Sequence, residues 1–307
     1  MKILVTGGAG FIGSVLVEEL LNDGHEVIAY DNLMYKQHSL LQFCHNKNFK
    51  FVCGDVRDEQ NLKKYIIEAD IVFPLAALVG VGACNKDKQG AVDINLGQIA
   101  FICDNKSKNQ RVIMPMTNSG YGTGEGTSFC TEESELKPLS HYGHTKCDAE
   151  KYLLLFENTV SLRLATVFGV CNRPRLDLLV NDFVFKSLSD GYLVLFEKDF
   201  KRNYIHIRDV VSAMKLMMTP QPYNVFNVGL SDANLSKIEL ALKIKNFLPN
   251  LVIHCEEFHR DPDQRNYLVS NLRLESLGWR PQYSLDDGIK ELIQAFPMLN
   301  HNKFKNV

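Results

Sequence analysis

A glycine-rich run near the start of the chain constrains its fold more than any other feature. Thr6-Gly7-Gly8-Ala9-Gly10-Phe11-Ile12-Gly13 follows the apolar run Ile3-Leu4-Val5 and precedes a stretch with the apolar spacing of a helix. Glycines at these positions permit a tight turn, close approach of the backbone to a pyrophosphate, and close packing of helix on strand. The helix N-terminus then presents free N–H groups to the phosphates. The run predicts a strand–loop–helix unit that binds a dinucleotide.

An acidic residue stands where the second strand is expected to end. Asp31 follows the glycines by about 20 residues, the spacing at which a carboxylate accepts hydrogen bonds from the adenosine ribose. The same carboxylate would repel the 2′-phosphate of NADP, so the sequence predicts NAD as the cofactor. A glycine-rich turn without a ligand is the alternative, and the flanking strand, the helix and Asp31 together argue against it.

Short apolar runs alternate with helical patterns over the first 165 residues. The runs typical of strands are Ile3–Val5, Glu26–Tyr30, Phe49–Cys53, Ile71–Phe73, Val112–Met116 and Val160–Leu164. This alternation predicts βαβ crossovers and a parallel sheet. Beyond residue 166 the pattern is less regular, and helices are expected near Asp177–Leu188, Arg208–Met218, Ser236–Phe247 and Leu285–Ala295. We expect an α/β fold: a Rossmann-like, doubly wound parallel sheet in residues 1–165, joined by some later segments, and a smaller mixed α/β substrate-binding lobe in residues 166–300.

The composition argues against several other classes of protein. The formal net charge of the 307 residues is −2, whereas nucleic-acid binders carry a strong basic excess. The eight cysteines include no C-x-x-C pair, so we expect reduced thiols and no metal site. No run approaches the roughly 18 apolar residues that span a membrane. The expected protein is cytoplasmic, with neither a nucleic acid nor a membrane as its partner.

A tyrosine and a lysine four residues apart are the strongest candidates for catalysis. Tyr142 and Lys146, in Ser140-His141-Tyr142-Gly143-His144-Thr145-Lys146, share one face of a predicted helix after the fifth strand. A neighbouring ammonium and the nicotinamide charge would lower the pKa of the tyrosine. A tyrosinate could then remove the proton from a sugar hydroxyl while hydride leaves the carbon. An exposed helical pair without a function has the same spacing, so the position of the pair in the fold carries this interpretation.

Further runs occur along nearly the whole chain in one order. They are D-N-L from Asp31, G-D-V from Gly54, L-A-A from Leu75, T-N-S-G-Y-G from Thr117, R-L-A-T-V-F-G from Arg163, R-N-Y-I-H-I-R-D from Arg202 and L-G-W-R-P from Leu277. With the glycine loop and the tyrosine–lysine helix, the set resembles the extended short-chain dehydrogenases/reductases of the nucleotide-sugar epimerase and dehydratase group. The family resemblance implies NAD as cofactor, a nucleotide sugar as substrate and at least a homodimer, with a homotetramer also possible, paired through the helix that carries Tyr142 and Lys146.

The resemblance also implies roles for individual residues. Tyr142 would be the catalytic base, Lys146 its partner, and Thr117 the third catalytic hydroxyl. The expected cofactor-binding residues are Gly7, Gly10, Phe11, Ile12, Gly13, Asp31, Asn32, Leu33, Asp55, Val56, Leu75, Ala76, Ala77, Asn95, Tyr142 and Lys146. The expected substrate-binding residues are Thr117, Asn118, Ser119, Thr166, Asn181, Arg202 and Arg265. Arg202 would bind the pyrophosphate, and Arg260 or Arg265 would add a second clamp.

The residues after Thr117 narrow the reaction. Family members that eliminate water carry an acid directly after this threonine, where the chain has Asn118 and Ser119, and neither is a useful general acid near neutral pH. Glu125 is the nearest carboxylate in sequence, but it is out of register. A 4,6-dehydratase is therefore disfavoured.

Three outcomes at C4 remain: release of the ketone by a 4-dehydrogenase, 4-epimerisation, or ketone reduction. An inactive NAD-sensing scaffold is a further alternative, disfavoured because Thr117, Tyr142 and Lys146 are all present. Several runs most resemble the enzymes that oxidise GDP-linked heptoses at C4 in capsule biosynthesis, among them R-L-D-L-L-V-N-D-F from Arg175 and D-P-D-Q-R-N-Y-L-V-S-N from Asp261. We therefore expect C4 oxidation of a GDP-linked sugar first and 4-epimerisation second.

Overall fold

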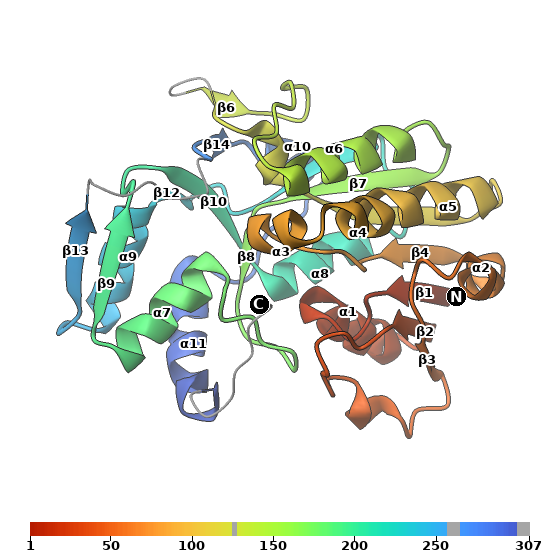
Figure 1. Cartoon of the computed structure of the whole chain (residues 1–307), viewed down its shortest axis with the longest axis horizontal. Coiled ribbons are helices and arrows are strands. Elements are labelled where there is room, and N and C mark those ends of the chain that lie inside the picture. Colours follow the sequence, from red (N-terminus) through yellow and green to blue (C-terminus); the bar gives the residue numbers. More distant parts are fainter. Residues whose placement is uncertain (125–127, 257–264, 300–307) are drawn as a thin grey trace.

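The computed structural model describes residues 1–124, 128–256 and 265–299. Seven strands pair in parallel into one sheet (Figure 1), in the order β11 (Val225–Val228), β7 (Thr159–Leu164), β5 (Arg111–Thr117), β4 (Ile71–Pro74), β1 (Lys2–Thr6), β2 (Glu26–Asp31) and β3 (Phe49–Cys53). The chain reverses its direction across the sheet between β1 and β4. In doubly wound sheets a ligand binds at such a switch point, outside the carboxyl ends of the strands. The predicted Rossmann-like parallel sheet is confirmed.

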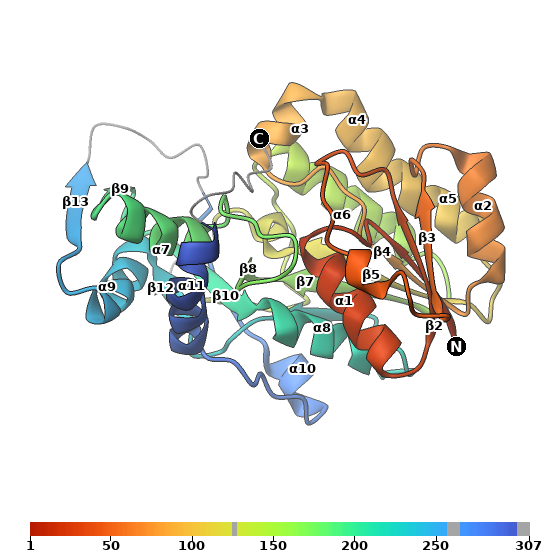
Figure 2. The same ribbon diagram turned by 90° about the horizontal axis from the view of Figure 1, so that it is seen from below.

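The two faces of the sheet are buried by different helices. Ile3 and Val5 of β1 lie in one apolar cluster and Leu4 lies in the other, as the alternation of side chains along a strand requires. The first cluster includes residues of α1 (Phe11–Asn22) and α8 (Ile207–Leu216). The second includes residues of α2 (Glu59–Glu68), α5 (Gln98–Asn105) and α6 (His141–Leu153). Figure 2 shows α1 and α8 together on one side of the molecule and α2, α4 and α5 on the other.

Short helical segments connect β4 to α5 and β5 to the loop before α6. They are α3 (Val81–Lys86), α4 (Lys88–Val92), the π-helical turn η2 (Asp93–Gly97) and the 3-10 turn η3 (Asn118–Tyr121), with a further 3-10 turn, η1 (Leu41–Phe43), between β2 and β3. The turn η3 begins directly after Thr117, so it carries the T-N-S-G-Y run out of the carboxyl end of β5.

A second lobe stands beside the carboxyl ends of the strands (Figure 1). One small sheet has the order β12 (Asn234–Ser236), β10 (Lys201–His206) and β8 (Thr166–Phe168), and a second pairs β13 (Val252–Glu256) with β9 (Tyr192–Phe196). The helices of the lobe are α7 (Leu179–Ser189), α9 (Lys237–Phe247) and α11 (Leu285–Leu299), where the apolar spacing predicts them. At α9 a capping box of Ser236 and Glu239 fixes the first turn.

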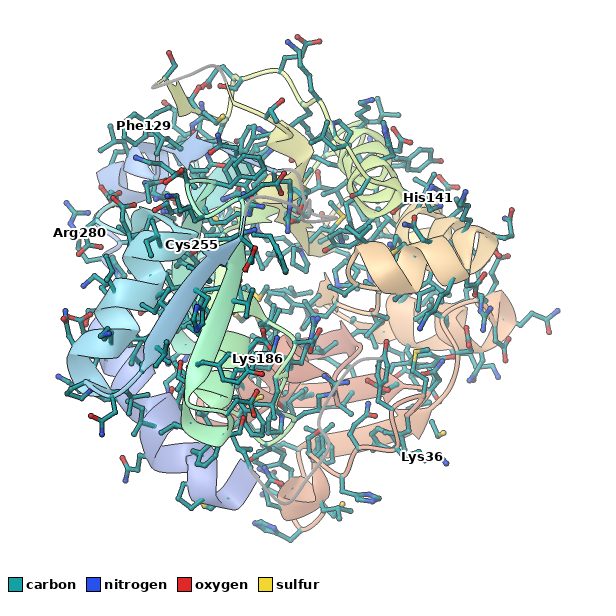
Figure 3. All side chains as sticks on the ribbon, turned by 60° about the vertical axis from the view of Figure 1, so that its left-hand side comes forward. Lys36, Phe129, His141, Lys186, Cys255 and Arg280 are labelled. Atoms are coloured by element: carbon teal, nitrogen blue, oxygen red, sulfur yellow. The ribbon has the colours of Figure 1, made fainter. Side chains whose placement is uncertain are left out.

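The remaining elements lie where the two parts meet. The two-stranded pair β6 (Phe129–Cys130) and β14 (Leu268–Val269) and the helix α10 (Leu272–Ser276) adjoin β11, the edge strand of the large sheet. From the lobe side, Lys186 of α7 and Cys255 of β13 lie on the lobe, and Lys36 and His141 lie across from them on the sheet domain (Figure 3). All eight cysteines lie in the described residues, and no disulfide joins any of them. Within the described ranges, every helix falls short of the length and apolar character that a membrane span requires.

Candidate active site

A cavity of about 560 Å³ lies over the carboxyl ends of β1, β2, β3, β4, β5 and β7 and is closed on its other side by the lobe. Most of the residues singled out in the sequence line this one cavity. They are Gly7, Gly10, Phe11, Ile12, Gly13, Asp31, Asn32, Asp55, Val56, Leu75, Ala76, Ala77, Thr117, Ser119, Tyr142, Lys146, Thr166, Arg202 and Arg265. The fold therefore brings the glycine loop, the tyrosine–lysine pair and the lobe arginines to a common space.

The glycine loop is shaped so that side chains do not fit. Gly7 has a φ of +65°, and a Cβ there would lie 2.6 Å from the backbone nitrogen of Ala76. A Cβ on Gly13 would lie 2.3 Å from the carbonyl oxygen of Gly7. Helix α1 then starts at Phe11 without a side-chain cap on its first N–H groups. These groups fit the phosphates of a dinucleotide.

We expect Gly13→Ala to abolish measurable NAD binding, because its Cβ would push the loop out of the conformation that admits a pyrophosphate. Gly97→Ala is the matched control, since a Cβ at Gly97 has its nearest neighbour at 3.8 Å. NAD titration by calorimetry and the melting temperature of both variants check this. A Gly13→Ala variant that binds NAD as tightly as Gly97→Ala would contradict the assigned role of the loop.

Asp31 is buried and its carboxylate is held in a fixed orientation. It accepts hydrogen bonds from the N–H of Leu33 at 2.8 Å, from the N–H of Ala9 at 3.0 Å and from Nε2 of Gln37 at 3.3 Å. Burial raises the pKa of Asp31, and the two backbone donors and the nearby charge of Arg173 oppose that rise. The carboxylate faces the cavity and fits an adenosine ribose. The side chain of Leu33 does not line the cavity. Leu33 contributes only the backbone N–H that donates to Asp31.

Two further residues meet across the cavity near Asp31. The guanidinium of Arg173, from the loop after β8, lies 4.7 Å from the centre of the Tyr35 ring, which follows β2. Both side chains line the cavity. This contact joins the lobe to the sheet domain over the end where the adenosine would lie. Neither residue carried a sequence signal, because each acts only through the docking of the lobe.

Hydroxyl groups gather at the end of β5. Thr117 Oγ1 and Ser119 Oγ lie 2.8 Å apart, and the N–H of Ser119 donates to Thr117 Oγ1 at 3.1 Å. The side chain of Thr117 helps to lower the pKa of Tyr142 against the stronger effect of burial, and the Arg265 guanidinium donates to Ser119 Oγ. Ser140 caps the first turn of α6 by accepting from the N–H of Gly143, which fixes the start of the helix beside this cluster.

The charges around the tyrosine differ from the sequence expectation. Burial raises the pKa of Tyr142 to about 12, and the opposing positive charges are those of Arg175 and Arg265. Burial lowers the pKa of Lys146 to about 8, against the charge of Glu150. In the chain alone desolvation outweighs the nearby cations. The predicted lowering of the tyrosine pKa also relied on the charge of bound nicotinamide, so it stays a prediction for the enzyme with NAD bound.

Besides Leu33, three predicted site residues lie outside the cavity lining. Asn95 is buried and bonds the backbone of Leu78 and the hydroxyl of Thr145. Asn181 is buried and bonds the backbone of Gly169 and Arg175. These two amides hold loops that border the cavity. Asn118 is also buried, and neither of its amide atoms has a hydrogen-bond partner within the described residues.

The lobe contributes cations that sequence spacing did not reveal. Arg175 and Lys237 line the cavity together with Arg202. Arg202 is almost fully buried, with its guanidinium 5.7 Å from the Tyr267 ring. Arg175 is paired with Asp177, Nε to Oδ1 at 3.2 Å. A cluster of guanidinium and ammonium groups suits a diphosphate. Arg260 and Glu125 lie outside the described residues.

Carboxylates occur in the described lining away from the hydroxyl cluster. They are Asp31, Asp55, Asp177 and Asp182. Asp55 is bonded to Arg57, which holds the pKa of Asp55 well below its usual range. Asp31 accepts the hydrogen bonds described above, and Asp177 is paired with Arg175. The cavity therefore combines a dinucleotide cradle with a hydroxyl, phenol and ammonium cluster suited to proton removal from a sugar hydroxyl.

Comparison with known proteins agrees with this geometry. The model of the NAD dependent epimerase/dehydratase family matches residues 3–229. The low-salt glycan biosynthesis protein Agl12 of Haloferax volcanii is 27% identical over 96% of this chain and 98% of its own length. The UDP-glucose 4-epimerase of Mycolicibacterium smegmatis is 29% identical over 96% and 98%.

A solved structure has the same fold. The UDP-glucose 4-epimerase of Thermus thermophilus in complex with NAD superposes with a TM-score of 0.84 at 25% identity, covering 97% of this chain and all of that one. The family match, the NAD-shaped cradle and the hydroxyl cluster lead to one conclusion. The chain belongs to the NAD-dependent epimerase/dehydratase family of extended short-chain dehydrogenases/reductases, and it is an NAD-dependent enzyme of the nucleotide-sugar type.

Proposed function

We propose that the protein oxidises C4 of a nucleotide-linked sugar to the 4-keto sugar, with a GDP-linked heptose as the favoured substrate. The observation that carries this proposal is the placing of Thr117, Ser119, Tyr142 and Lys146 on the same cavity as the glycine loop. The local runs shared with GDP-heptose 4-dehydrogenases support the choice of nucleotide and sugar.

In this proposal Tyr142 removes the proton of the sugar O4, and Thr117 and Ser119 orient that oxygen through hydrogen bonds. Bound NAD⁺ supplies the acceptor for the C4 hydride. The positive charges of Arg175 and Arg265 stabilise the tyrosinate that forms and oppose its desolvation without outweighing it. In this proposal the Lys146 ammonium and the charge of bound nicotinamide add to that stabilisation. The N–H groups at the start of α1 and the carboxylate of Asp31 hold the cofactor. Arg202 and its cationic neighbours hold the diphosphate of the substrate.

Elimination of water receives no support from the cavity. Ser119 bears a hydroxyl that already bonds Thr117 and Arg265, and Asn118 does not line the cavity. A hydroxyl and an amide are poor acids at neutral pH. The chemistry is therefore proposed to stay at C4.

A 4-epimerase is the second candidate. It is favoured by the similarity to the UDP-glucose 4-epimerases named above, and it would use the same residues with return of the hydride to the opposite face of the ketone. UDP-linked sugars are thus the natural comparison substrates.

Purified enzyme mixed with NAD⁺ and either GDP- or UDP-linked sugars separates these candidates. We expect NADH absorbance to rise and mass spectrometry to show a 4-keto GDP-sugar that is lighter than the substrate by two hydrogen atoms. A C4 epimer of a UDP-sugar with no lasting NADH would instead assign the epimerase. Loss of water from the sugar would contradict both.

A further inference from the structure

A buried ion pair lies directly behind the proposed catalytic residues. Glu150 follows Lys146 by one turn and Tyr142 by two turns on α6, and its side chain is buried. Nε of Arg163 on β7 donates to both carboxylate oxygens of Glu150 at 3.1 Å, and NH2 of Arg163 lies 3.1 Å from Glu150 Oε2. Arg163 is only 6% exposed. The pair therefore fastens the catalytic helix to the central sheet.

The same arginine also reaches the segment that carries the catalytic hydroxyls. NH1 of Arg163 donates to the hydroxyl of Tyr121 at 3.0 Å, and the guanidinium lies 5.4 Å from the Tyr121 ring centre. Tyr121 is the last residue of η3, the turn that begins directly after Thr117 and contains Ser119. One guanidinium thus binds both the helix of Tyr142 and Lys146 and the turn of Thr117 and Ser119.

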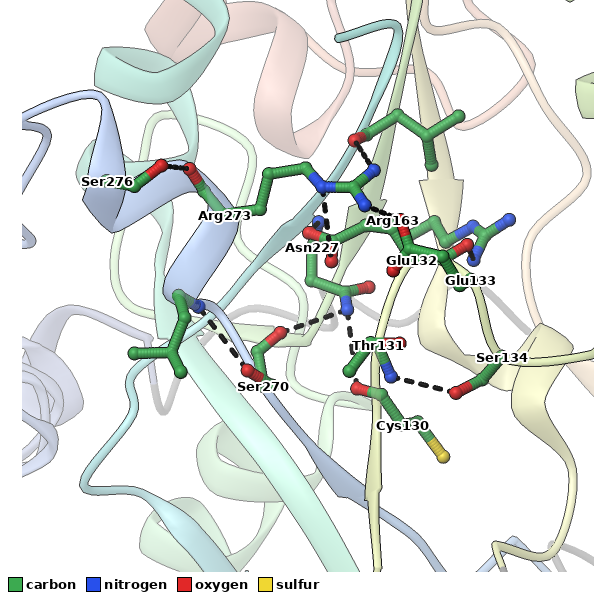
Figure 4. A network of polar contacts seen from close by, with 12 residues as sticks. Cys130, Thr131, Glu132, Glu133, Ser134, Arg163, Asn227, Ser270, Arg273 and Ser276 are labelled. Carbon is green, nitrogen blue, oxygen red and sulfur yellow. Dashed lines mark hydrogen bonds and ion pairs between the residues drawn. The ribbon is translucent and has the colours of Figure 1, made fainter.

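The contacts continue away from the cavity (Figure 4). The Tyr121 hydroxyl donates to Asn227 Oδ1 at 2.7 Å, and the N–H of Asn227 on β11 donates to Glu132 Oε1 at 2.8 Å. NH1 of Arg163 also donates to the carbonyl of Glu132 at 3.0 Å, and Glu132 faces Arg273 of α10 at 3.7 Å. Negative and positive side chains therefore alternate from the catalytic helix to the outer edge of the sheet. These contacts hold Arg163 in place.

Stability alone is a weak explanation for such a pair. Burying two charges costs about as much free energy as their attraction returns, so neutral side chains of similar volume often serve the fold equally well. The pair differs from a neutral substitute in two respects: its geometry is fixed by several hydrogen bonds, and Glu150 presents a negative charge to Lys146. The charge of Glu150 raises the pKa of Lys146, against the lowering that burial causes.

We propose that Glu150 and Arg163 are positioning residues for the reaction. Arg163 sets the distance between the Thr117–Ser119 turn and the Tyr142–Lys146 helix, and Glu150 keeps Lys146 in its ammonium form. This inference rests on the proposed function in requiring that Thr117, Tyr142 and Lys146 carry out the chemistry, whichever nucleotide sugar is the substrate.

A cycle of three variants tests the proposal: Glu150→Gln, Arg163→Met, and the two together. Each single variant leaves one buried charge unpaired and should melt below the wild type, whereas the double variant should recover most of the lost melting temperature. We expect kcat of the folded double variant to remain about 10²-fold below wild type, the size of loss that a small misplacement of reacting groups produces. KM for the nucleotide sugar should change little.

The pH profile and a matched control separate positioning from folding. Without the negative charge of Glu150, Lys146 should lose its proton at a lower pH. The alkaline loss of activity of Glu150→Gln should therefore begin at a lower pH than that of the wild type. Arg111→Met is the control, because Arg111 is also buried and bonded, to Met217 and Asn158, but lies at the opposite end of β5 from Thr117. It should lower the melting temperature and leave the pH profile and kcat unchanged.

Two results would overturn the inference: a double variant that regains both melting temperature and wild-type kcat, or a Glu150→Gln profile that superposes on that of Arg111→Met. Failure of the proposed function shows differently, since the wild type itself would then not transfer hydride to NAD⁺ from a nucleotide sugar. The melting measurements need no substrate and remain informative in either case.

Discussion

Tyr142→Phe should lose turnover by about 10²–10⁴-fold, the usual contribution of a positioned acid or base. The change removes the phenol oxygen whose pKa is lowered by the positive charges of Arg175 and Arg265 and by the side chain of Thr117. The ring is kept, so the packing of α6 against the cavity should be preserved. Single-turnover formation of NADH from the nucleotide sugar measures the effect.

The affinity of Tyr142→Phe for NAD serves as the control measurement for this variant. The glycine loop and Asp31 lie on other elements, so Tyr142→Phe should bind NAD within a small factor of wild type in a fluorescence titration. A variant that turns over at the wild-type rate would remove the tyrosinate mechanism. Loss of NAD binding together with turnover would show that the substitution disturbs the cofactor site instead.

Lys146→Met should abolish measurable turnover and yet stabilise the chain without its cofactor. Burial lowers the pKa of Lys146 to about 8 from an ordinary value of 10.5. At neutral pH the folded protein therefore holds an ammonium in surroundings that disfavour the charge, while the unfolded chain holds it in water. Removing that charge should raise the free energy of unfolding at pH 7 by roughly 1–3 kcal/mol.

The sign of this effect gives a distinctive pH dependence. Between pH 8 and 10.5 the unfolded wild-type chain binds a proton at Lys146 that the folded chain has released, so wild-type stability gains relative to the variant as pH rises. The difference in melting temperature should be largest near pH 7 and shrink toward pH 10. A Lys146→Met protein that melts below wild type at pH 7 would show that the ammonium stabilises the fold. A lysine retained at a cost in stability is typical of a functional site.

Much of the sheet domain was predictable because its signals are local. Glycine spacing, apolar runs and helical periodicity each depend on a few neighbouring residues. They located β1 to β5 and β7, the helix after the glycine loop and the helix that carries Tyr142 and Lys146. The strand β11 was not found, since Val225–Val228 is short and contains the polar Asn227. Its place in the sheet depends on pairing with β7 and on the buried contacts of Asn227, both distant in sequence.

The site was predictable only as far as its motifs extend. The residues of the glycine loop, Thr117 and the tyrosine–lysine pair lie on the cavity, because each directly follows a strand end or starts a helix there. Arg173 and Arg175 were missed because they reach the cavity only through the docking of the lobe, and Tyr35 was missed because it follows β2 without belonging to a motif. The rise that burial causes in the pKa of Tyr142 could not be predicted either, because no pattern of residues reports how much water the fold removes.

The most direct test of C4 chemistry uses a GDP-linked heptose that carries deuterium at C4. The labelled sugar is mixed with wild-type enzyme and NAD⁺, and the cofactor and the sugar are then examined by mass spectrometry. We expect the deuterium to appear in NADH and the sugar to become the 4-keto product without loss of water. Deuterium that is retained at C4 of a C4 epimer would contradict release of the 4-keto sugar and assign the epimerase, and loss of the deuterium to solvent would contradict hydride transfer from C4.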